Sequence, residues 1–141
     1  EGFTLEVLLG DGTAISSHTV FEQDRWCLHW NHSVARFLVR DCFVVSDGQM
    51  VLERSHQPDF AAGLGHIPGR GEMTSAPEGG YWIEDMNEPI RNNCLRLRIG
   101  AIGVDHRIVL DGHEESLSER AAGQSARIVL RPSGKAGDGQ C

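Results

Sequence analysis

The chain has 141 residues, of which 40% are hydrophobic, and this is enough for one domain around a single core. Its formal net charge of -7 argues against a nucleic-acid-binding protein, because such proteins gather basic residues on one surface. No apolar run approaches the roughly 20 residues that a membrane-spanning helix needs.

Polar and apolar residues alternate with a period of two along much of the chain, and no long window shows the 3.6-residue period of a helix. In chain order, we expect strands at Phe3–Leu9, His18–Phe21, Arg25–His32, Phe37–Ser46, Gln49–His56, Tyr81–Glu84, Leu95–Ile99, His106–Leu110 and Ala126–Arg131. The pattern predicts an all-β, single-domain antiparallel β-sandwich or barrel of about eight or nine strands over residues 1–132. One helical turn is expected near Ser118–Ala122.

The segments between the strands also carry signals. Asp47-Gly48 is typical of a two-residue hairpin turn, because both central residues of a type I′ turn need positive φ. Residues 57–80 are rich in proline and glycine, which predicts a long Gly/Pro-rich loop at one end of the sheet. Residues 133–141 are glycine-rich and polar, and we expect a flexible C-terminal tail there.

The four cysteines, Cys27, Cys42, Cys94 and Cys141, lie far apart and form no CxxC pair. This spacing disfavours a structural zinc site and a thioredoxin-like motif, and we expect neither a metal nor a cofactor. In an oxidising compartment the cysteines would form two bridges in any of three pairings. We interpret the first three as small hydrophobic strand residues and the last as a terminal thiol.

Four ionisable residues, His32, Asp41, Arg54 and His56, fall on strand faces whose other members are apolar. His32 extends the apolar face of its strand, and Asp41 interrupts the apolar face of the next one. Counting back from the hairpin turn places Asp41 opposite Arg54 and Val39 opposite His56. Buried charges are costly unless they are paired or reached by a ligand, so these four residues are the candidate ligand-binding residues.

Three interpretations of this cluster remain open. Asp41 and Arg54 form a salt bridge that fixes the strand register, or Arg54 presents its guanidinium to a small anionic ligand in a pocket. The third interpretation is a small hydrolase-like enzyme that uses His32 and Asp41. Because no GxSxG nucleophile motif is present, we expect a protein that is not an enzyme and assign no catalytic residues.

Several short segments together resemble a bacterial family, domain-of-unknown-function family 1850, over roughly residues 3–131. They are Trp30-Asn31-His32-Ser33-Val34, Asp59-Phe60-Ala61-Ala62-Gly63-Leu64, Gly80-Tyr81-Trp82-Ile83, Leu95-Arg96-Leu97-Arg98-Ile99-Gly100 and Asp105-His106-Arg107-Ile108-Val109-Leu110-Asp111-Gly112. The chain departs from the family pattern at Ala35, where an acidic residue is usual, and at Ala61, where glycine is usual.

Members of that family tend to be encoded beside the membrane subunit of TAXI-type tripartite ATP-independent periplasmic (TRAP) transporters. The resemblance implies a secreted bacterial protein in the periplasm or at the outer face of the inner membrane. Because the chain begins at Glu1, we expect its signal or anchor segment to be absent. The implied role is an accessory one in solute uptake, with the TRAP transporter membrane subunit or its solute-binding protein as partner.

Overall fold

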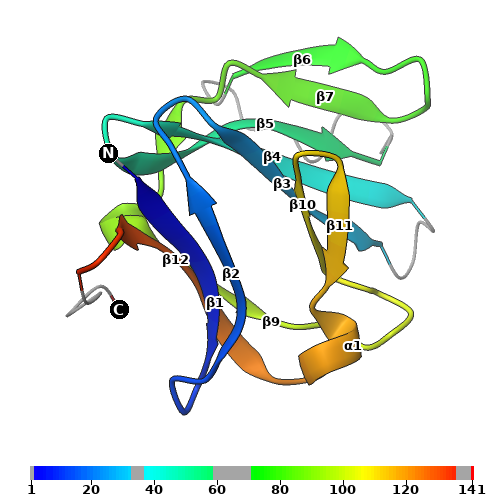
Figure 1. Ribbon diagram of the computed structural model, residues 1–141. Helices are drawn as coiled ribbons and strands as arrows, with labels where there is room; N and C mark the ends of the chain where they lie inside the picture. The colour runs from blue at the N-terminus through cyan, green and yellow to red at the C-terminus, as the bar shows by residue number, and fades with distance from the viewer. Residues whose placement is uncertain (1, 33–36, 59–70, 136–140) are drawn as a thin grey trace.

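The computed structural model describes residues 2–32, 37–58, 71–135 and 141, and these form two antiparallel sheets (Figure 1). The smaller sheet contains, in order, β2 (Ala14–Val20), β1 (Phe3–Leu9), β12 (Ser125–Pro132) and β9 (Cys94–Arg98). The larger sheet contains, in order, β11 (His113–Ser116), β10 (Arg107–Leu110), β3 (Arg25–Asn31), β4 (Leu38–Ser46), β5 (Gln49–Gln57), β7 (Tyr81–Glu84) and β6 (Glu72–Ser75), with β8 (Glu88–Pro89) paired to β5. A 3₁₀ turn, η2 (Arg91–Asn93), precedes β9, and a one-turn helix, α1 (Ser118–Ala121), precedes β12.

The all-β prediction is confirmed, and the architecture is a sandwich. The described residues form twelve strands rather than the eight or nine expected, because the sequence pattern missed β6, β8 and β11. These strands are short and largely polar, so they lack the apolar alternation that marks the others. No helix among the described residues is both long and apolar enough to cross a membrane.

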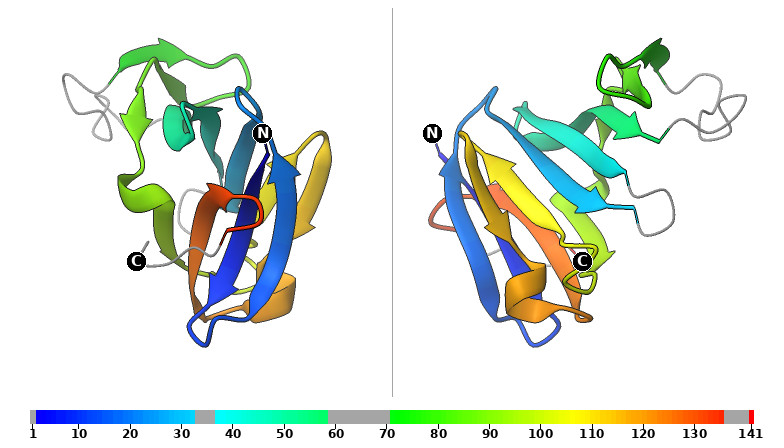
Figure 2. Two further views of the ribbon diagram at one scale, coloured as in Figure 1. Left: turned by 60° about the vertical axis from the view of Figure 1, so that its left-hand side comes forward. Right: turned by 90° about the vertical axis from the view of Figure 1, so that its right-hand side faces the viewer.

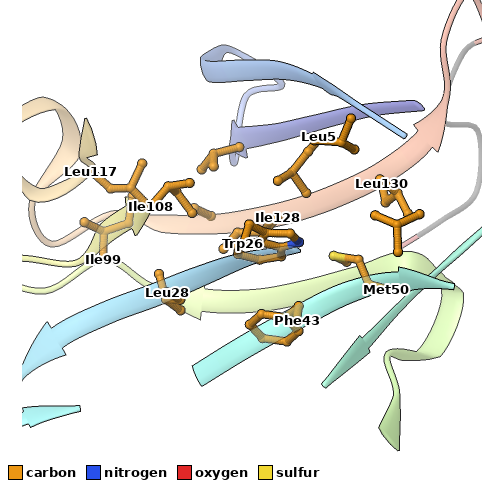
Figure 3. Close-up of a cluster of buried hydrophobic side chains, with 14 of the residues drawn as sticks. Leu5, Trp26, Leu28, Phe43, Met50, Ile99, Ile108, Leu117, Ile128 and Leu130 are labelled. Carbon is orange, nitrogen blue, oxygen red and sulfur yellow. The ribbon is translucent and has the colours of Figure 1, made fainter. Parts of the chain in front are cut away.

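The core lies between the two sheets, and alternate residues of β1, β3, β4 and β12 make the largest contribution to it (Figure 3). Trp26 and Phe43 stack at its centre, with ring centroids 4.4 Å apart and planes inclined by 15°. Leu5, Ile128 and Leu130 face them from the smaller sheet, and all five side chains are buried. The far end of the larger sheet, formed by β6 and β7, extends beyond the smaller sheet (Figure 2).

The pairing of β4 with β5 departs from the predicted hairpin at one point. From the turn back to Phe43 the register is as expected. One extra residue in β5, Glu53, then forms a β-bulge, which places Asp41 opposite Ser55. The predicted pairing of Asp41 with Arg54 is therefore wrong.

The bulge also turns Arg54 and His56 to the outer face of the sheet. Arg54 lies beside Cys42, and His56 lies opposite Arg40 rather than opposite Val39 as predicted. This arrangement has a physical advantage, because a half-exposed guanidinium keeps part of its hydration, whereas a charge in the sandwich core would lose all of it.

The cysteines form two disulfides, so their interpretation as hydrophobic residues and a free thiol is wrong. Cys27 and Cys42 are direct cross-strand neighbours on β3 and β4, with Cα atoms 4.1 Å apart. Cys94, at the start of β9, is joined to Cys141. The pairing escaped prediction because connectivity depends on which strands are neighbours, and spacing alone does not reveal this.

The predicted loop and tail lie partly outside the described residues. Within residues 57–80, β5 continues to Gln57 and β6 pairs with β7, while residues 59–70 are not described. Residues 136–140 of the tail are likewise outside the described part, and Cys141 is fixed by its disulfide.

Candidate functional site

The four residues singled out in the sequence lie in three different places. His32 follows the end of β3, where its backbone N–H donates to the carbonyl oxygen of Phe37 at 2.8 Å. Its side chain helps to line a hollow of about 590 Å³, whose other lining residues are Asn31, Phe37, Leu38, Ala101, Gly103 and Val104. This hollow is mostly apolar, and none of the other three predicted site residues is among its described lining residues.

Asp41 lies on the inner face of β4. Its Oδ1 accepts a hydrogen bond of 2.5 Å from the Ser55 hydroxyl, which in turn accepts one of 2.6 Å from the Gln57 amide. Asp41 is opposite Leu28, and His32 comes four residues later, so the two backbones are separated by roughly 13 Å along the strand. The side chains that a hydrolase-like reaction would combine are therefore out of reach of each other.

Arg54 and His56 do come together, on the outer face, around Trp82. The Arg54 guanidinium carbon lies 3.7 Å from the Trp82 ring centroid, and Arg54 Nη2 donates to Glu84 at 2.7 Å. The His56 ring stacks on Trp82 with centroids 4.6 Å apart and planes inclined by 13°. His56 Nε2 donates to the carbonyl oxygen of Gly79 at 2.8 Å, since a carbonyl only accepts.

The loop beneath His56 depends on glycine at one position. Gly80 has φ of 70°, and a side chain there would overlap the carbonyl oxygen of Gln57 and the ring of Phe37. Phe37 in turn packs edge-on against His56, with ring centroids 4.8 Å apart. This close packing leaves the His56 side chain only 1% exposed.

The same face carries three further cationic or ionisable residues that the sequence reasoning missed. Successive cross-strand neighbours on β10, β3, β4, β5 and β7 form one line, which we call the outer row: Arg107, His29, Arg40, His56 and Trp82. The Cys27–Cys42 disulfide lies two residues from both His29 and Arg40, so it fixes the register of the strands that present them. Had this pairing been known, it would have placed His29 opposite Arg40.

Carboxylates lie near the arginines but bind them loosely. Arg107 is 3.6 Å from Asp105 and 3.7 Å from Glu114, and Arg40 is 3.8 Å from Glu78. These separations exceed hydrogen-bond length, unlike the Arg54–Glu84 pair. The guanidinium groups of Arg40 and Arg107 therefore keep donor capacity.

His29, between these two arginines, is held uncharged at neutral pH. Burial lowers its pKa from 6.5 to about 4, and the positive charges of Arg40 and Arg107 act in the same direction, against a smaller opposing effect of Glu114. A neutral imidazole avoids placing a third positive charge between Arg107 and Arg40.

Five nitrogens on this face are buried without a hydrogen-bond partner within the part of the chain that the structure describes. They are His29 Nδ1, Arg40 Nε, Arg54 Nε, His56 Nδ1 and Arg107 Nε. A buried donor without an acceptor costs about 1–3 kcal/mol, and the arginine Nε atoms only donate. The face is thus suited to a ligand that supplies acceptor oxygens.

The pKa of His29 leads to a prediction about pH. Between pH 6.5 and pH 4, the His29 imidazole binds a proton in the unfolded chain but not in the folded chain. The stability that the neutral His29 side chain provides above pH 6.5 is therefore lost as the pH falls from 6.5 to 4. Because His29 is only half-buried, we expect a loss of about 2 kcal/mol rather than the full value of the shift. Urea titrations at pH 7 and pH 4.5 measure it, and His29→Gln, which stays neutral, should lose correspondingly less. Equal losses in both proteins would contradict the assignment.

The described residues contain no group of three or more His, Cys, Asp or Glu that could hold a metal ion. The outer face offers guanidinium donors, a neutral imidazole and an aromatic ring, and guanidinium donors match the acceptor oxygens of anionic groups.

The residues of the outer row lie in a segment of the chain that is similar to a known protein family. A family model described as a domain of unknown function (DUF1850) matches residues 27–117, which include all five residues of the outer row. No curated protein and no solved structure matches the chain.

Proposed function

The chain belongs to the DUF1850 family of domains of unknown function, and from this premise we propose that it is a secreted, non-enzymatic accessory module that binds a small anionic solute. The observation that carries the proposal is the outer row, where Arg40 and Arg107 flank a neutral His29 and all three have buried nitrogens without partners among the described residues. A carboxylate bound there would accept from the guanidinium donors and relieve their repulsion.

The setting in the proposal is the bacterial periplasm or the outer face of the inner membrane. Disulfides persist in oxidising compartments and are rare in the cytosol, and the two bridges of this chain support an extracytoplasmic location. The sequence resemblance supports the partner, a TRAP transporter membrane subunit or its solute-binding protein. In this role the module would hold or deliver a solute rather than transform it.

Isothermal titration with acetate, succinate and glutarate tests the binding site. We expect binding by the wild-type chain and at least tenfold weaker binding after Arg40→Gln, because this change removes the guanidinium at the centre of the row. Arg120→Gln is the matched control: Arg120 pairs with Glu115 beside α1, away from the row, and should bind as wild type does. Absence of binding for all three acids, or equal weakening in both variants, would overturn the proposal.

A second experiment tests the transporter role. The full-length protein, expressed in its own bacterium, is expected to co-purify with the neighbouring transporter or with its solute-binding protein. Uptake by a deletion strain should be reduced and should be restored by the wild-type gene but not by the Arg40→Gln gene. Normal uptake in the deletion strain, with no association, would count against this part of the proposal.

A further inference from the structure

The outer face of the smaller sheet carries a separate group of arginines at its β9 edge. Arg96 on β9 lies directly opposite Arg127 on β12, and Arg98 follows two residues later on the same face of β9. Like charges in direct cross-strand contact are destabilising. We call these three side chains, Arg96, Arg98 and Arg127, the β9 arginine cluster.

The cluster lacks neutralising partners. Among the described residues no carboxylate oxygen lies within 4.0 Å of these guanidinium groups, whereas Arg131, on the same face of β12, pairs with Glu6 at 2.9 Å. The chain has a net charge of -7, and most of its described arginines have an acidic neighbour. Within the described part of the chain, the charges of the cluster therefore lack the nearby carboxylates that Arg25, Arg54 and Arg131 have.

The three arginines also line one hollow. Its volume is about 490 Å³, and its remaining lining residues are Gly10, Leu97, Ser125, Ala126 and Cys141. Cys141 is bound to Cys94, two residues before Arg96, so a disulfide stands at one side of the hollow. The hollow is large enough for a compact charged group, and β9 and β12 hold its three arginines on a rigid, paired surface.

We propose that the β9 arginine cluster is a binding site for a phosphate group, distinct from the outer row of the larger sheet. Guanidinium groups present parallel N–H donors that match phosphate oxygens, and three of them around one hollow suit a group with several acceptor oxygens better than a single carboxylate. The same chemistry would be offered by a soluble phosphate ester or by the headgroup of an anionic phospholipid. Both sources would relieve the repulsion between Arg96 and Arg127.

The experiment has two arms that separate these sources. In the first, glycerol 3-phosphate is titrated calorimetrically into the wild-type chain; in the second, the chain is sedimented with vesicles of phosphatidylglycerol and phosphatidylcholine. We expect binding in at least one arm and at least tenfold weaker binding after Arg127→Gln. The control, Arg91→Gln, removes an exposed arginine of η2 that lies outside the hollow, and should leave binding unchanged.

The melting temperature provides a second measurement, which separates a loss of phosphate binding from a folding defect. Since Arg127→Gln removes a like-charge contact, its Tm in chloride should equal or exceed that of the wild type, and phosphate should raise the wild-type Tm more than that of the variant at equal ionic strength. No binding in either arm, or equal weakening by Arg91→Gln, would overturn the site. Arg40→Gln should leave phosphate binding intact, so failure of the phosphate site and failure of the solute site can be told apart.

Discussion

Replacing Trp26 with alanine is expected to lower the free energy of unfolding by about 4 kcal/mol, because the indole ring fills the centre of the core. Trp26 is 1% exposed and stacks on Phe43 between the sheets, so its removal leaves a cavity that the paired strands cannot fill by moving. Urea titration followed by circular dichroism measures the change.

Trp26→Phe is the matched control for this change. Phenylalanine retains an aromatic ring against Phe43, and its cost should be less than half that of alanine. A loss below about 1 kcal/mol for Trp26→Ala would mean that the two sheets do not close on this residue as the structure shows.

Removal of the Cys27–Cys42 disulfide is expected to have an effect of similar size. The bridge joins residues separated by 15 positions, and the chain-entropy relation assigns about 3 kcal/mol to a loop of this length. We expect Cys27→Ala/Cys42→Ala to lower the free energy of unfolding by this amount and to weaken solute binding, because the disulfide holds His29 beside Arg40.

The double variant Cys94→Ala/Cys141→Ala is the comparison for this result. It removes the other disulfide, which is remote from the outer row, so it should lower stability without weakening solute binding. Unchanged stability after loss of the Cys27–Cys42 bridge, under oxidising conditions, would contradict the prediction.

The parts of the fold that sequence reasoning predicted are those that local pattern determines. β1 and β7 begin and end where the alternation predicted, and the Asp47-Gly48 turn has the expected positive φ at both residues, 52° and 73°. In each case the information lies within a few neighbouring residues, either as a period of two or as a turn dipeptide.

The candidate site was predicted only in part, because it depends on contacts between distant segments. Arg54 and His56 were identified, but their partner Trp82 was not among the candidate residues, and the bulge at Glu53 has no compositional signal of its own. Arg107 reaches the outer row from a strand that is far away in the sequence. Such neighbours become visible only when the order of strands in the sheet is known.

The bulge at Glu53 also affects how relatives of this chain should be compared. Before the bulge, the even-numbered positions of β5, such as Met50, face the sandwich core; after it, the odd-numbered positions, such as Ser55, face inward. A relative that lacks only the bulged residue would pair regularly here and would still place the counterparts of Arg54 and His56 on the outer face and that of Ser55 on the inner face. A relative of the same length without the bulge would exchange the inner and outer positions beyond this point. An alignment gap at Glu53 therefore leaves the residues of the outer row on the same face, and the alternation of odd and even positions must be counted separately on each side of it.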